Sequence, residues 1–118
     1  MKLRIQGNGL RLRLTRKEVT QLHDCGHVES SIEIAPGRAL GYGLEGSPQA
    51  TSVTASFDGC TILVSVPTAM VKEWAEGDQV SIEGPAQTGV QLLIEKDFQC
   101  LHKPDARDPD AFPNPLAP

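Results

Sequence analysis

Residues 2–19, which read KLRIQGNGLRLRLTRKEV, decide the fold of the chain. Apolar and polar residues alternate on both sides of the central Gly-Asn-Gly, and alternation around such a turn predicts a β-hairpin. A helix is predicted to follow at once, because Thr15 and Glu18 have the spacing of a capping box. Gly26 is a suitable residue to end that helix.

A second segment repeats this pattern without a gap, fifty-two residues further along the chain. Gly7 aligns with Gly59, and most of the apolar positions agree in kind. Residues 1–46 and 53–98 are therefore interpreted as two pseudo-repeats. In the second one, Thr68 is the predicted helix N-cap. The predicted fold is α+β: a duplicated β-β-α-β-β unit that forms an eight-stranded antiparallel sheet or barrel with two short helices.

One domain is predicted over residues 1–103, because a chain of 118 residues suits a single hydrophobic core. Residues 104–118 form an acidic tail whose prolines exclude a helix or a central strand. Phe112 and Leu116 are apolar anchors within it. We therefore expect the tail to lie across the body, with its aspartates near the N-terminal arginines.

Alternation divides the strand residues into an apolar face and a polar face. The apolar face must be covered, either because the sheet closes around it or because helices and a partner shield it. A concave polar face would gather its charges into one anion site, where arginine suits phosphate or carboxylate oxygens. The alternative is an ordinary solvated face with cross-strand ion pairs. The candidate anion-binding residues are Arg4, Arg11, Arg13, Glu29, Glu33 and Glu95.

The duplicated order of elements over residues 1–98 resembles the CYTH-like triphosphate-tunnel fold, in which two strand-and-helix repeats close into an eight-stranded antiparallel barrel. The resemblance implies a tunnel whose charged strand faces bind triphosphate with a divalent metal, and hence a binder or hydrolase of phosphate or polyphosphate. That family opens with Glu-x-Glu-x-Lys. This chain opens with Lys2-Leu3-Arg4-Ile5-Gln6, with basic residues in place of the metal-binding carboxylates. A tunnel also requires the charged face to be the interior one.

Several short segments are similar to those of a family of small bacterial proteins of unknown function. They are the opening KLRIQGNGLRLRLT, KEWAE at 72–76, EKDF at 95–98 followed by Cys100-Leu101, and DAFPNP at 110–115. The resemblance spans nearly the full chain. It implies no activity, and no cofactor is assigned.

A metal site is a further hypothesis. The candidate ligands are His23, Cys25 and His27, together with Cys100 and His102 near the C-terminus. Zinc binds such side chains in a tetrahedral array. The ligands of a zinc site, however, are usually spaced along the sequence as two paired knuckles. The simpler interpretation is a helix that ends at Gly26, where the helix dipole favours a nearby histidine.

Composition narrows the possible partners. The net charge of -4 argues against nucleic acid and anionic membranes, and no segment approaches membrane-spanning length. Three widely spaced cysteines fit reduced thiols in a cytoplasm. No glycine-rich phosphate loop or nucleophile elbow occurs. The sequence therefore predicts a cytoplasmic, non-enzymatic binding or assembly domain, with a phosphate-type anion as a candidate ligand and a homo-oligomer as a candidate assembly.

Overall fold

The computed structural model describes residues 1–84, 89–98 and 112. Within these residues the chain is α+β, as predicted. Its elements in chain order are β1 (Lys2–Gln6), β2 (Gly9–Leu14), α1 (Arg16–Cys25), β3 (His27–Ala35), β4 (Arg38–Ser47), β5 (Thr54–Phe57), β6 (Thr61–Pro67), α2 (Thr68–Glu76), β7 (Ser81–Glu83) and β8 (Gln91–Lys96). The tail of residues 104–118 lies outside the described residues except for Phe112, and so does its predicted position across the body.

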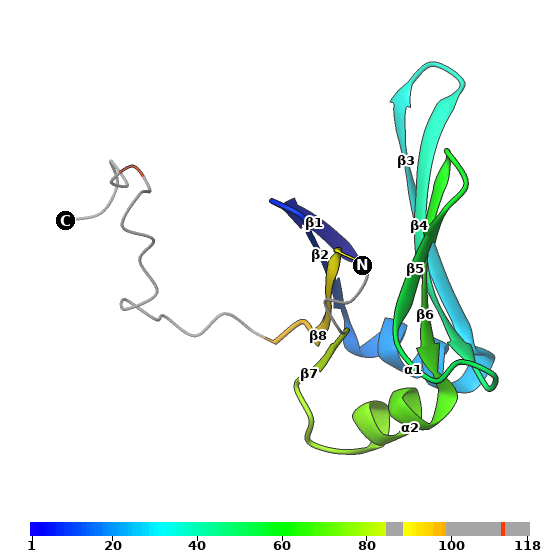
Figure 1. Ribbon diagram of the computed structural model, residues 1–118, viewed down its shortest axis with the longest axis vertical. Coiled ribbons are helices and arrows are strands. Elements are labelled where there is room, and N and C mark those ends of the chain that lie inside the picture. Colours follow the sequence, from blue (N-terminus) through cyan, green and yellow to red (C-terminus); the bar gives the residue numbers. More distant parts are fainter. Residues whose placement is uncertain (85–88, 99–111, 113–118) are drawn as a thin grey trace.

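The strands form two four-stranded sheets (Figure 1). Sheet A has the order β1-β2-β8-β7, and sheet B has the order β3-β4-β6-β5. The outer pairs of each sheet are antiparallel, whereas the central pairs, β2 with β8 and β4 with β6, are parallel. The predicted single antiparallel sheet or closed barrel was therefore wrong. After each of β2 and β6 the helix carries the chain to the other sheet, so the free edge of β2 pairs with β8 from the far end of the chain.

The pseudo-repeat of residues 1–46 and 53–98 stays a prediction. Its gapless alignment places Val28 on Val80, but the structure does not treat these residues alike. Val28 is buried, whereas Val80 is 51% exposed and Ile82 takes the buried place in β7. In the strands that follow each helix, a constant shift of fifty-two residues therefore does not align buried residues with buried residues.

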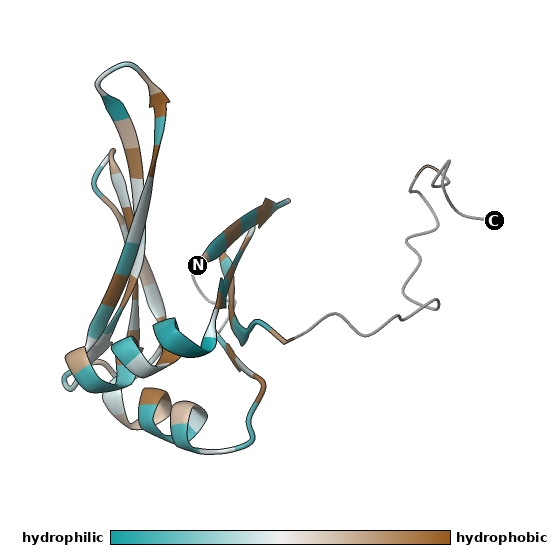
Figure 2. Ribbon diagram, turned by 180° about the vertical axis from the view of Figure 1, so that it is seen from behind, coloured by the Kyte–Doolittle hydropathy of each residue, from teal (hydrophilic) through white to brown (hydrophobic). Residues whose placement is uncertain are grey.

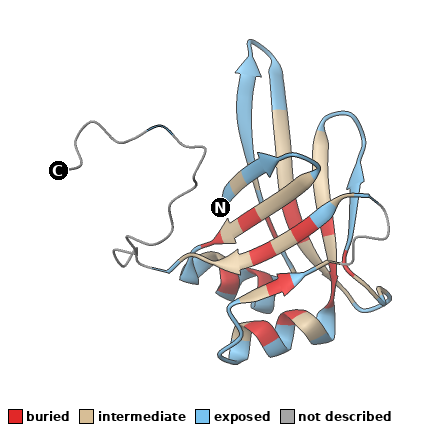
Figure 3. Cartoon of the chain, turned by 60° about the vertical axis from the view of Figure 1, so that its left-hand side comes forward, coloured by how far each residue is buried: buried red, intermediate tan, exposed pale blue. Residues whose placement is uncertain are grey.

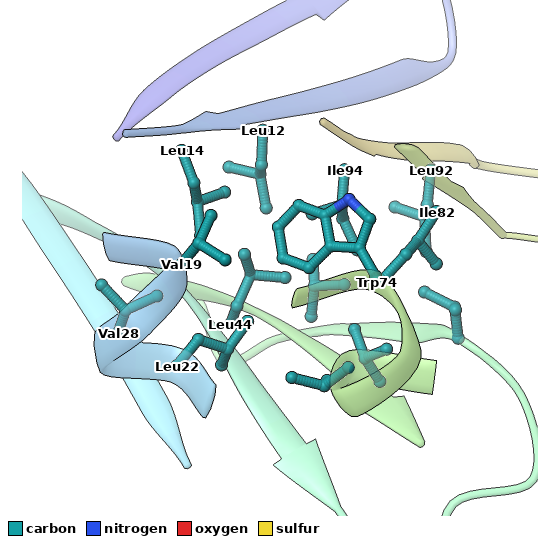
Figure 4. Packing of buried hydrophobic residues seen from close by; sticks show 14 residues of the cluster. Leu12, Leu14, Val19, Leu22, Val28, Leu44, Trp74, Ile82, Leu92 and Ile94 are labelled. Carbon is teal, nitrogen blue, oxygen red and sulfur yellow. The ribbon is translucent and has the colours of Figure 1, made fainter. Parts of the chain in front are cut away.

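The core lies between the two sheets at the end where the helices pack. Both helices contact strands of both sheets, and they also contact each other. Figure 4 shows the indole of Trp74 among side chains from β2, β7 and β8, with Leu44 of β4 nearby. The helices supply Val19, Leu22, Val71 and Trp74, each buried. The apolar strand faces therefore point inward, toward the helices and the opposite sheet.

The apolar faces are longer than the core that covers them. Buried residues gather near the helices, while the far ends of the hairpins are exposed (Figure 3). Ile5 and Phe57 are each 63% exposed and Ile32 is 55% exposed, although all three continue an inward-facing row. The two sheets thus share a closed, helix-covered end and an open end. Neither helix in the described part of the chain has the length and apolar character needed to cross a membrane.

The two helices begin in different ways. The predicted capping box of α1 is confirmed: Thr15 Oγ1 accepts from the backbone N–H of Glu18 at 3.3 Å, and Glu18 Oε1 accepts from that of Thr15 at 3.0 Å. Gly26 ends α1 with a φ of 83°, a left-handed conformation that favours glycine. The predicted Thr68 N-cap was wrong, because Thr68 is already helical and Pro67 precedes it without a side-chain cap bond.

Replacing Thr15 with alanine is expected to lower the free energy of unfolding by about 1 kcal/mol, the usual value for a side-chain N-cap. Thr68→Ala is the matched control, since the same hydroxyl is removed at a helix start where it caps nothing. Chemical denaturation of both variants would measure the difference. Equal losses for the two variants would show that the Thr15 cap has no special role.

Candidate anion-binding surface

The basic side chains near the N-terminus meet on one face of sheet A. Gly7 allows the tight turn of the β1–β2 hairpin, with a φ of 55°. The register pairs Lys2 with Arg13 and Arg4 with Arg11. Alternation then directs these four side chains away from the core, to the outer face of the sheet, because Leu3, Leu10 and Leu12 between them pack inward.

The parallel strand β8 adds a carboxylate to this face. It pairs Glu95 with Arg13, which lies far away in the sequence. Arg13 donates to Glu95 Oε1 from Nε at 3.1 Å and from Nη2 at 2.9 Å, and Arg11 Nε lies 3.6 Å from the same oxygen. Lys2 Nζ lies 3.3 Å from Asp97. Glu95 thus holds Arg13 firmly and Arg11 more loosely.

Two hollows lie on this outer face. The smaller, about 150 Å³, is lined by Lys2, Arg4, Arg11 and Arg13 alone. The larger, about 560 Å³, adjoins it through Arg4 and Arg11, and it reaches across the sheet to Glu83 and to the polar side chains Gln6 and Gln91. We call the smaller hollow, with the four residues that line it, the basic pocket.

Arg4 differs from the other members of the basic pocket. Lys2, Arg11 and Arg13 each have a carboxylate within ion-pair distance. Among the described residues, no carboxylate lies within that distance of Arg4. A guanidinium of this kind presents its fork of donors to a ligand without first giving up a partner.

Two of the six predicted anion-binding residues do not join this site. Glu29 and Glu33 lie on β3, in sheet B, whereas Arg4, Arg11, Arg13 and Glu95 lie together on sheet A. Glu33 instead accepts from the backbone N–H of Gly37 at 3.2 Å, within the turn of its own hairpin. The separation follows from the split of the strands into two sheets.

Sequence reasoning missed Lys2, Gln6 and Gln91 as members of the site. Lys2 and Gln6 could have been found from alternation, since they lie on the same strand face as Arg4. Gln91 could not, because only the pairing of β2 with β8 places it beside Gly9.

The predicted metal ligands are not gathered in the described residues, where no group of three His, Cys, Asp or Glu side chains is placed to hold a metal ion. The ring of His23 bridges the ends of the two helices, with Nε2 at 2.7 Å from Glu76 and Nδ1 at 2.8 Å from Asp24. The hydrogen bond with Glu76, and then that with Asp24, raises the pKa of His23. A higher pKa means that a proton competes more strongly with a metal ion for the imidazole nitrogens of His23.

The other proposed metal ligands lie apart. The imidazole of His27 lies 3.7 Å from Glu29, and Cys25 is an exposed free thiol at the end of α1. Cys100 and His102 lie outside the described residues.

Comparison with known proteins gives a family but no relative of known activity. No curated protein and no solved structure matches the chain. One family matches residues 1–116, nearly the whole sequence, and its description is a family of unknown function. The chain therefore belongs to the family of unknown function DUF7009.

Proposed function

We propose that this chain is a non-enzymatic binding domain that holds a phosphate-type anion in the basic pocket. The observation that carries the proposal is that four basic side chains, Lys2, Arg4, Arg11 and Arg13, line one hollow of about 150 Å³. Four cations crowded on one face repel each other, and Glu95 and Asp97 together relieve only part of that repulsion. A bound oxyanion would relieve the rest.

Binding is favoured over hydrolysis by the chemistry of the pocket lining. Guanidinium and ammonium groups carry hydrogen-bond donors and no acceptor, which suits them to hold an oxyanion. The inward direction of the apolar face also removes the charged tunnel that the CYTH-like hypothesis needs. The adjoining hollow, with Gln6, Gln91 and Glu83, leaves room for an organic group attached to the anion.

The test uses Arg4→Ala/Arg11→Ala in the full chain. Titration calorimetry with inorganic phosphate, pyrophosphate and tripolyphosphate should show binding to the natural chain. A charge-assisted hydrogen bond contributes about 1.5–3 kcal/mol. Removal of both guanidinium groups should therefore weaken the binding of the tightest-binding anion at least about tenfold. The difference in affinity between phosphate and tripolyphosphate would show how far the ligand extends into the larger hollow.

The matched control is Arg38→Ala/Lys72→Ala, which removes two exposed positive charges that do not line the pocket. The control should bind as the natural chain does. An equal loss in both double variants would mean that only the overall charge attracts the anion, and the proposed pocket would be wrong.

Assembly is the second candidate, supported by β3. This nine-residue strand lies at the edge of sheet B, with its outer hydrogen-bonding groups open to another strand. Light scattering would show whether copies associate. We also propose a reducing, cytoplasmic setting, since Cys25 and Cys60 are exposed free thiols.

A further inference from the structure

The outer face of sheet A carries an apolar side chain in the middle of β8. Hydrophilic and hydrophobic residues alternate along β1, as the bands beside the N-terminus in Figure 2 show. In β8 the alternation is interrupted by three successive apolar residues, Leu92, Leu93 and Ile94. Leu92 and Ile94 are buried in the core, so Leu93 between them points outward.

The register places Leu93 in a row of side chains that crosses the whole sheet. Arg4 pairs with Arg11, which pairs in turn with Leu93. Leu93 then pairs with Glu83 of β7, which faces outward because its neighbour Ile82 is buried. All four members of the row line the larger hollow of about 560 Å³. The hollow thus has guanidinium groups at one end, an apolar side chain in the middle and a carboxylate at the other end.

Glu83 is the carboxylate of this face that has no cation beside it. Glu95 accepts hydrogen bonds from Arg13, and Asp97 lies 3.3 Å from Lys2 Nζ. Within residues 1–84, 89–98 and 112, no cationic group lies within ion-pair distance of Glu83. Its oxygens are therefore open to a donor on a ligand. A ligand that is only an anion would gain nothing from a carboxylate at this place, whereas a positive group would be attracted to it.

We infer that the ligand is a phosphate ester whose far end carries an amino group, an inference that rests on the proposed function of the basic pocket. The phosphate lies against Arg4 and Arg11, where the two hollows adjoin. The organic part crosses Leu93, and the ammonium group meets Glu83. Neighbouring strands lie about 4.8 Å apart, and two such steps lead from β2 through β8 to β7, so the two charged ends of the ligand are about 10 Å apart.

The neighbouring row of the hollow provides polar contacts for the organic part. Gly9 lies between Gln6 and Gln91 in the register. It leaves the middle of that row without a side chain, and a Cβ there would lie only 3.3 Å from the backbone oxygen of Gln6. The two amides on either side both donate and accept hydrogen bonds. They suit hydroxyl or amide groups along the ligand.

Two phosphate esters that differ only in the amine test the inference in the full chain. Aminohexyl phosphate carries its ammonium at the end of a six-carbon chain that can span the two strand steps, and hexyl phosphate lacks the ammonium. Dissociation constants come from backbone amide shifts in an NMR titration at low salt, because salt screens exposed charges. The natural chain should bind aminohexyl phosphate about two- to fivefold more tightly than hexyl phosphate, the gain of an exposed ion pair.

Glu83→Gln should remove this preference and should bind hexyl phosphate no more weakly than the natural chain does. The matched control is Glu29→Gln, which removes an exposed carboxylate from sheet B and should keep the preference. Aminoethyl phosphate is too short to reach Glu83. Its affinity relative to that of ethyl phosphate should therefore be the same in the natural chain and in Glu83→Gln.

The outcomes separate this inference from the proposed function. Equal binding of the two hexyl esters by the natural chain, or a preference that survives Glu83→Gln, would overturn the inference alone. The basic pocket would still stand if hexyl phosphate binding is lost in Arg4→Ala/Arg11→Ala. Hexyl phosphate that does not bind, or that binds equally well to Arg4→Ala/Arg11→Ala, would overturn the proposed function and the inference with it.

Discussion

Trp74→Ala is expected to lower the free energy of unfolding by about 3–5 kcal/mol, the range for a fully buried large aromatic side chain. Trp74 is 0% exposed, and its indole Nε1 donates to the backbone oxygen of Val80 at 3.1 Å. Lys96 Nζ lies 5.8 Å from the ring centroid, within the range of a cation–π contact. The ring therefore links α2 to sheet A, and its loss leaves a cavity at the junction of three elements.

The measurement is urea denaturation followed by circular dichroism, since Trp74 is the single tryptophan and its fluorescence disappears with the substitution. Trp74→Phe is the informative comparison, because it keeps an aromatic ring while it removes the indole donor and part of the side-chain volume. We expect a smaller loss for it, about 1–3 kcal/mol, from the unpaired Val80 oxygen and the reduced volume. A near-neutral Trp74→Ala would contradict the placement of α2 against sheet A.

Leu44→Ala should cost about 2–5 kcal/mol, the range for truncating a buried leucine. Leu44 is 0% exposed and lies in β4 between Val28 and Val64, both of which are buried. Its side chain faces the helices and the opposite sheet, so little can move to fill the space that it leaves.

Ile34→Ala is the control for Leu44→Ala. Ile34 lies on β3 of the same sheet but is 68% exposed, at the irregularity between Glu33 and Ala35. Its truncation should change the free energy of unfolding by no more than about 0.5 kcal/mol, as for other surface positions. Comparable losses at Ile34 and Leu44 would show that the core extends to the tip of the hairpin.

The proposed pocket depends on Glu95 as well as on the arginines. Glu95 Oε1 accepts two hydrogen bonds from Arg13, and Arg11 lies near the same oxygen. One partly buried carboxylate thus fixes the orientation of the Arg13 guanidinium group and weakens its repulsion with that of Arg11. An anion would meet one guanidinium group, that of Arg13, that is already positioned, which reduces the entropy lost on binding.

The elements themselves could be predicted from the sequence, because the interactions that specify them are local. The alternation of residues 2–14, the glycine of the first turn and the capping box of Thr15 and Glu18 each act within a few residues. The grouping of Arg4, Arg11 and Arg13 followed from the same alternation. Thr68 was misassigned because an N-cap and a first helical residue look alike when proline precedes them.

By itself, then, the sequence determined the strands, the hairpin turns, the first helix and the face on which the arginines lie. Only the tertiary structure decided that the strands divide into two sheets and that β8 lies parallel to β2. That pairing brings Glu95 to Arg13 and leaves Glu29 and Glu33 in the other sheet. The physical reason is that the partner of a strand edge is selected by how the whole chain buries its apolar faces, which no short stretch of sequence specifies.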